Sequence, residues 1–103
     1  MVHTEQLAPD TIIFHVDGII DKGVARELGF SVFRSYQLGF KTYFLNLCEV
    51  SCIQPEASKN LRLIEEGIRE KGGTLKIIAP PSLCLNPEMF KMTLSAVPPQ
   101  TWN

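Results

Sequence analysis

The chain lacks a long apolar run and an excess of charge of either sign. No stretch of its 103 residues approaches the roughly 20 consecutive apolar residues of a membrane-spanning helix. The start at Met1 lacks the basic and apolar regions of a signal peptide. Ten basic and eleven acidic residues give a net charge of -1, with no Lys or Arg cluster that would follow a phosphate backbone. We therefore expect one soluble, cytoplasmic domain that binds no nucleic acid and does not insert directly into a membrane.

The cysteines do not form a metal-binding pattern. Cys48, Cys52 and Cys84 are an odd number, and Cys-x3-Cys without a nearby His cluster is not a zinc spacing. Because free cysteine is among the most buried residue types, we predict that all three are small buried apolar residues. A reactive thiol at Cys52, close to a predicted helix start, is the alternative.

Signals of catalysis are also missing. The chain has no Gly-x-x-x-x-Gly-Lys loop, and neither His3, in a terminus expected to fray, nor His15 has a nucleophile and carboxylate at a triad spacing. His15 is predicted to be a surface or cross-strand residue. Glu65 and Glu66 are adjacent on a predicted helix, diverge in direction and are interpreted as a solvated face. The sequence predicts no enzyme and no cofactor.

The apolar pattern of the first half predicts a strand and a helix. Residues 11–17 alternate, with Ile12, Phe14 and Val16 on the buried side and Ile13 on the other. A helix follows, with Asp21 as its N-cap and Gly39 as its stop. Its predicted buried stripe comprises Val24, Ala25, Leu28, Val32, Phe33 and Tyr36.

The second half repeats this order. Residues 42–47 are predicted to be a buried strand, and Pro55 with Glu56 to start the next helix, where a proline and an acid are favoured. That helix should bury Ala57, Leu61, Ile64 and Ile68 and end at Gly72. A strand over 74–79 and a last helix from 86 to about 94 complete the pattern. Strands alternating with helices predict an α/β fold, a mostly parallel sheet of four to five strands with helices packed on it.

Three segments of the chain resemble the STAS family, the sulphate transporter and anti-sigma factor antagonist domains. They are residues 17–21 (Asp-Gly-Ile-Ile-Asp), which are similar to the family's Gly-Glu-Leu-Asp turn, residues 44–53 and residues 71–75. The resemblance covers roughly residues 10–96 and has the same order of elements. It implies a single STAS-like domain over residues 1–97, followed by a loose C-terminal tail over 98–103.

The family's phosphorylatable serine has no counterpart in this chain. STAS domains usually carry Asp-Ser-Ser-Gly or Asp-Ser-Thr-Gly after the central strand, where this sequence has Gln54, Pro55, Glu56 and Ala57. The resemblance implies a non-catalytic, regulatory, protein-binding module of bacterial type that docks an anti-sigma factor kinase or a related regulatory protein. The docking residues it implies are Asp21, Lys22, Gln54, Pro55, Glu56, Ala57 and Ser58.

Glu56 has two interpretations. Its carboxylate is either a fixed partial mimic of the phosphorylated state or a favourable residue at a helix start. In both, a kinase has no hydroxyl to modify at position 56.

Other functions and assemblies remain open at this point. The alternative function is an accessory STAS subunit of a membrane anion- or lipid-transport assembly, and a third is small-ligand binding at the carboxyl ends of the strands. Phe90, Met92 and Trp102 would lack a cover if the chain ended after its last predicted helix, which predicts either self-association, for example as a homodimer, or a larger assembly.

Overall fold

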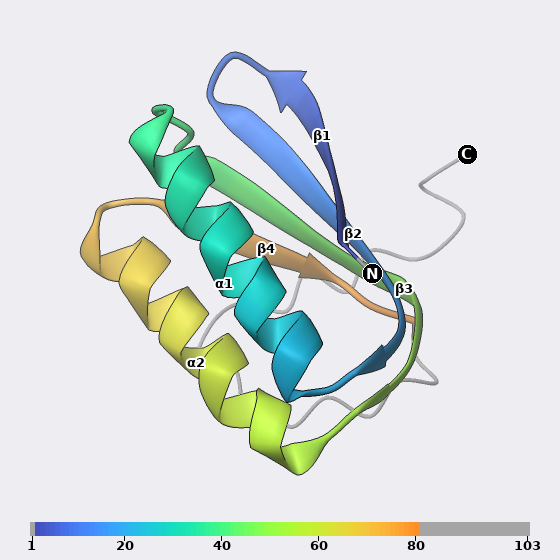
Figure 1. Cartoon of the computed structure of the whole chain (residues 1–103). Coiled ribbons are helices and arrows are strands. Elements are labelled where there is room, and N and C mark those ends of the chain that lie inside the picture. The colour runs from blue at the N-terminus through green and yellow to red at the C-terminus, as the bar shows by residue number, and fades with distance from the viewer. Residues whose placement is uncertain (1, 81–103) are drawn as a thin grey trace.

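Two helices cover one face of a four-stranded sheet in the computed structural model, which describes residues 2–80 (Figure 1). The elements in chain order are β1 (Val2–Ala8), β2 (Thr11–Ile20), α1 (Lys22–Gln37), β3 (Thr42–Ile53), α2 (Pro55–Glu70) and β4 (Thr74–Ile78). The strands lie in the order β1-β2-β3-β4. β1 is antiparallel to β2, whereas β2, β3 and β4 are parallel. The predicted α/β class and mostly parallel sheet are confirmed; the helix predicted from residue 86, Cys84 and the tail lie outside the described residues.

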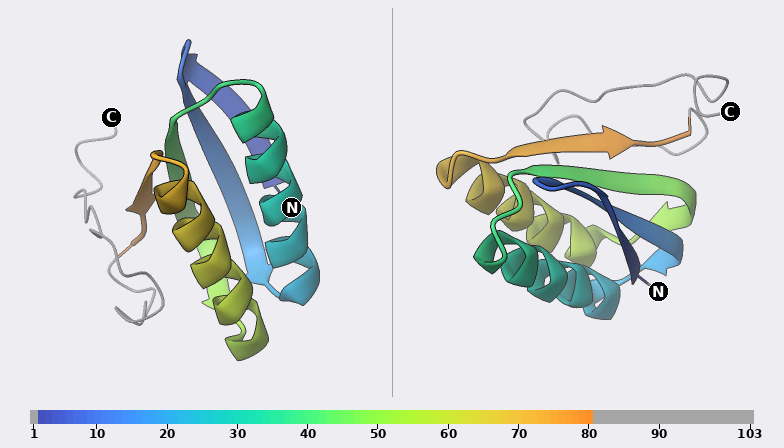
Figure 2. Two further views of the ribbon diagram at one scale, coloured as in Figure 1. Left: turned by 90° about the vertical axis from the view of Figure 1, so that its left-hand side faces the viewer. Right: turned by 90° about the horizontal axis from the view of Figure 1, so that it is seen from above.

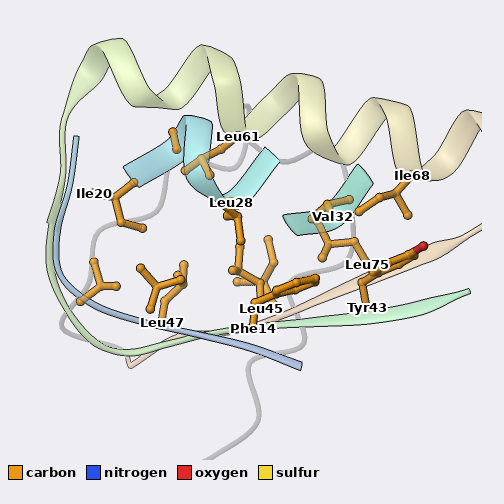
Figure 3. Close-up of a cluster of buried hydrophobic side chains, with 14 of the residues drawn as sticks. Phe14, Ile20, Leu28, Val32, Tyr43, Leu45, Leu47, Leu61, Ile68 and Leu75 are labelled. Carbon is orange, nitrogen blue, oxygen red and sulfur yellow. The ribbon is translucent and has the colours of Figure 1, made fainter. Parts of the chain in front are cut away.

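Both helices lie on the same face because the parallel strands are adjacent in chain order. Each crossover of a parallel pair is right-handed, so two crossovers that advance in one direction place their helices on one side (Figure 2). The core fills the space between this helix layer and the sheet (Figure 3). Its fully buried large side chains include Phe14, Ile20, Leu28, Tyr43, Leu47, Leu61 and Ile77.

The helix boundaries agree with the predicted signals. The Asp21 side chain accepts a hydrogen bond from the Val24 amide at 2.8 Å, as an N-cap should. Pro55 is the first residue of α2, where its missing N–H costs nothing. Beyond the helix ends, Gly39 and Gly72 have φ angles of +95° and +78°, which glycine adopts without strain.

The first strand was not predicted from the sequence. Residues 2–8, which include His3, do not fray but pair with β2 as an edge strand. The residues between Val2 and Ala8 are all exposed, so no alternation of apolar and polar residues marks this segment as a strand. Backbone pairing with β2 therefore holds this segment, and its composition gives no sign of it.

The predicted burial of the cysteines is wrong for the two that the structure describes. β3 continues to Ile53, well past the predicted end at residue 47, and its register against β2 shifts twice, each time adding one residue to β3. Each shift interrupts the alternation of side chains between the two faces. Cys48 and Cys52 are consequently exposed, while Leu47 and Val50 face the core.

Several side chains lie on faces other than those predicted. Phe33 and Tyr36 of α1 are exposed, because the stripe facing the sheet is the narrower set Ala25, Leu28, Val32 and Ser35. Glu65, predicted to be solvated, is buried with 1% of its surface exposed, because it follows Ala57 and Leu61 at four-residue spacing in the stripe of α2. Ile13, predicted on the polar side of its strand, is also buried.

Candidate functional site

Two turns meet at the end of the molecule where both helices begin. The Gln54 amide donates a hydrogen bond to the Ile20 carbonyl at 3.0 Å, which joins the end of β3 to the end of β2. β2 and β3 are parallel neighbours, so their carboxyl ends lie side by side. The N-termini of α1 and α2, which follow these strands, therefore lie at the same end of the molecule (Figure 1). Residues about 33 positions apart in the sequence therefore form one surface, as the register pair Ile20–Ile53 requires.

The first half of this surface is the start of α1. Asp21 is exposed, and its carboxylate is held by the Val24 amide while its carbonyl accepts from the Ala25 amide at 3.0 Å. Lys22 is exposed beside it. The cap fixes the direction of the Asp21 carboxylate, and Lys22 places an exposed positive charge next to it.

The second half is the start of α2. Gln54 has extended backbone, its side chain makes no cap hydrogen bond, and its carbonyl accepts from the Ala57 amide at 2.9 Å. Pro55 and Glu56 are exposed, whereas Gln54 and Ser58 are half-buried. The Ser58 hydroxyl lies 3.5 Å from the Gln54 carbonyl oxygen, at the limit of hydrogen bonding. Glu56 is the acid in the first turn of this helix.

Ala57 differs from the other six residues of the predicted docking set. Its side chain has no exposed surface and belongs to the core cluster between α2 and the sheet. It anchors the first turn of α2 and does not present a side chain to a partner. We call the remaining six residues, Asp21, Lys22, Gln54, Pro55, Glu56 and Ser58, the turn surface.

Two further properties concern residues 2–80 alone. No three His, Cys, Asp or Glu side chains in this range gather as a group that could hold a metal ion. Neither described helix is long and apolar enough to cross a membrane.

A chain of polar side chains crosses the opposite face of the sheet. His15 of β2 lies between Glu5 of β1 and Asn46 of β3, with Nε2 at 3.1 Å from Glu5 Oε1 and Nδ1 at 2.9 Å from Asn46 Nδ2. Asn46 Oδ1 in turn accepts from the Cys48 amide at 3.0 Å. His15 is thus a cross-strand residue, but its partner Glu5 lies in the strand that the sequence did not predict. The sequence did not indicate that β1 lies beside β2, so the contact between Glu5 and His15 could not be predicted.

Solved structures of other proteins share this fold. No protein-family model matches the sequence, and no curated protein matches it. The chain superposes, however, on the anti-sigma factor antagonist SpoIIAA in its unphosphorylated form, with a TM-score of 0.67 over 85% of this chain and 91% of that one at 12% identity. The phosphorylated form of SpoIIAA, the Bacillus cell fate determinant, gives a TM-score of 0.67 over 80% of this chain and 75% of that one, also at 12% identity.

A longer protein carries a similar unit. Mglu matches with a TM-score of 0.70 and 20% identity over 80% of this chain, which corresponds to only 20% of the Mglu chain. TM-scores of 0.67 to 0.70 establish a shared fold, and at identities of 12 to 20% they establish the fold alone. The STAS-like fold predicted from residues 17–21, 44–53 and 71–75 is therefore confirmed by the likeness to SpoIIAA.

Proposed function

We propose that this protein is a regulatory, protein-binding module of the anti-sigma factor antagonist type that binds an anti-sigma factor kinase, or a related regulatory protein, through the turn surface. The hydrogen bond between Gln54 and Ile20 is the observation that carries the proposal. It brings two turns from separate parts of the sequence into one surface, on which Asp21, Lys22 and Glu56 present exposed charges of both signs. Complementary charges at such a surface give specificity for a partner and speed its association.

The match to SpoIIAA supports the same conclusion. That protein is an anti-sigma factor antagonist that exists in an unphosphorylated and a phosphorylated form. By the sequence resemblance, Glu56 occupies the position in the helix turn where STAS domains carry the modified serine, and Glu56 is exposed. We infer that the module binds its partner constitutively and is not switched by phosphorylation at this turn.

Capture experiments with charge-reversed variants test the turn surface. The wild-type chain, Glu56→Lys and Glu70→Lys would be immobilised and exposed to extract of the native host, and retained proteins identified by mass spectrometry. Glu70 is exposed at the other end of α2, so its reversal changes the net charge equally and is a matched control. We expect a regulatory kinase or related protein to be retained by wild type and by Glu70→Lys, and lost with Glu56→Lys.

Two outcomes contradict the proposal. A partner retained equally by all three chains would place binding away from the turn surface, and recovery of transporter subunits would favour a role in a transport assembly.

The absence of phospho-control is tested separately by incubating the chain with the captured kinase and ATP. An added phosphate on Ser51 or Ser58, the hydroxyls nearest Glu56, would show that the turn is switched after all.

A further inference from the structure

Exposed apolar side chains gather between the two helices, on the face away from the sheet. α1 and α2 run side by side in the same direction along this face (Figures 1 and 2). Two adjacent hollows, of about 140 and 470 Å³, lie between them and share Gly29, Phe33, Leu63 and Ile64. We call these hollows together the interhelical groove. Phe30, Phe33 and Leu63 line it together, with 67%, 56% and 63% of their surfaces exposed, and so form one apolar patch.

Core residues form the floor of the groove. Val32, Tyr43 and Ile68, which Figure 3 shows between the helices and the sheet, also line the smaller hollow. Gly29 of α1 and Gly67 of α2 carry no side chain to fill the space above them. Two glycines and three exposed apolar side chains thus make a concave apolar surface. A patch of this kind usually marks an interaction site.

The charged residues that the structure describes along the groove are all basic. Lys22 and Arg26 line its lower end, where the helices begin, and Lys71 lines its upper end. A third hollow shares Tyr36 and Lys71 with the upper end and adds Lys41. Among residues 2–80, the three hollows are therefore lined by four basic residues and by no acidic residue.

We propose that the interhelical groove binds an amphipathic helix of a partner protein that carries acidic residues at both of its ends. The apolar walls offer few polar partners to an extended peptide backbone, whereas a helix satisfies its own backbone groups and presents an apolar stripe. Lys22 and Tyr36 are 14 positions apart on α1, a distance of about 21 Å at 1.5 Å per residue. Acidic side chains about four turns apart would therefore reach the basic residues at the two ends together.

The same charges argue against a second copy of this chain as the occupant. The groove is basic at both ends, so two copies packed groove against groove bring like charges together whether the helices run parallel or antiparallel. Like charges across an interface suppress pairing, and an acidic partner removes this penalty. This inference goes beyond the turn surface, from which the groove is separate except at Lys22.

Selection from a peptide library tests the groove directly. Displayed helical peptides of about 18 residues would carry a constant leucine stripe at helical spacing, with Glu, Lys or Gln allowed at the positions flanking its two ends. The full chain is the target. We expect selection to enrich Glu at both ends. No enrichment, or enrichment of Lys, overturns the proposal.

Three variants locate the binding of a selected peptide. Phe33→Ser removes an apolar wall and Arg26→Glu reverses one of the charges, while Leu38→Ser removes an even more exposed apolar side chain that lines none of the three hollows. Fluorescence anisotropy should show affinity falling about tenfold or more in the first two and less than about twofold in the third. Equal affinity in all four chains overturns the proposal.

Two further measurements exclude other occupants. Sedimentation of the full chain that shows a dimer, lost in Phe33→Ser but kept in Leu38→Ser, would assign the groove to a second copy and overturn the proposal. Binding to anionic phospholipid vesicles that is lost in Phe33→Ser but kept in Leu38→Ser would assign the groove to a lipid surface and would also overturn the proposal. All four chains should have superimposable circular dichroism spectra, because each substituted residue is exposed.

Discussion

Glu65 is the one charged side chain in the described core, and its two oxygens differ. Oε2 lies 3.2 Å from Arg69 Nη1, and Oε1 is buried without a hydrogen-bond partner. Arg69 itself is half exposed. Burying a carboxylate is costly unless it is paired, so a single exposed arginine provides most of its compensation.

Removing that arginine should therefore destabilise the fold. Arg69→Ala leaves the buried carboxylate without its cation, and we expect the free energy of unfolding to fall by about 1 to 3 kcal/mol. Arg62→Ala is the matched control, since Arg62 lies 3.2 Å from Glu66 at the same four-residue spacing with both side chains at the surface. An exposed pair of this kind contributes about 0.5 kcal/mol or less. Equal losses in urea unfolding of the two variants would contradict the special role of Arg69.

The hydrogen-bond chain through His15 fixes the position of a proton. Asn46 Oδ1 accepts from the Cys48 amide, so Asn46 turns its amino group toward His15 Nδ1. Nδ1 must then accept, which leaves the imidazole proton on Nε2, facing Glu5. A histidine tautomer is inferred from its hydrogen-bond network, and here the Cys48 amide, which can only donate, sets the orientation of Asn46 and with it the tautomer of His15.

Nitrogen chemical shifts of the imidazole ring test this assignment. At a pH where the ring is neutral, His15 should be almost entirely the Nε2–H tautomer, whereas His3, its register partner on β1, should show a mixture. Asn46→Ala should weaken the preference of His15, because the donor to Nδ1 is lost. A dominant Nδ1–H form of His15 in the wild-type chain would mean that Asn46 has the opposite orientation.

At the scale of elements, Asp21 both starts α1 and contributes a charge to the turn surface. These roles can be separated, because asparagine also caps helices but carries no charge. Asp21→Ala should lower the free energy of unfolding by about 0.5 to 2 kcal/mol, and Asp21→Asn by less. Urea unfolding gives the loss, and amide exchange should quicken in the first turn of α1 in the alanine variant alone. Equal destabilisation by both substitutions would show that charge, and not the cap, stabilises the helix start.

The sequence predicted those element boundaries that depend on the backbone preferences of single residues. Asp21, Pro55 and Gly72 mark helix ends through their own backbone preferences, so both helices were predicted close to their observed bounds. The strand β1 and the two register shifts of β3 depend on pairing between segments, and no residue in them signals it. The burial of Glu65 and the exposure of Phe33 also follow from how the helices pack. The groove was missed for this reason, since an apolar residue at helical spacing is usually buried.

For the whole molecule, Tyr43 reports how tightly the helix layer covers the sheet. It lies in the core between the two layers (Figure 3), and its hydroxyl donates a hydrogen bond to the Phe40 carbonyl at 2.6 Å. Burial disfavours the phenolate, and negative charge on nearby Tyr36 at high pH adds to this effect, so the pKa of Tyr43 is raised above its usual value. The folded state therefore keeps a proton that the unfolded state loses first.

This difference predicts that stability falls at alkaline pH. The contribution of Tyr43 is complete below about pH 10, the usual tyrosine pKa, and is lost as the pH rises from there through the raised pKa of the folded state. Tyr43→Phe should cost about 0.5 to 1.5 kcal/mol at neutral pH through the lost hydrogen bond and should show a smaller alkaline loss than wild type. Tyr36→Phe, which keeps the buried phenol, should retain most of that loss. Urea unfolding at neutral and alkaline pH makes the comparison. If the stabilities of wild type and Tyr43→Phe fall in parallel, Tyr43 is reached by water before the fold opens, and the helix layer covers the sheet less tightly than this packing requires.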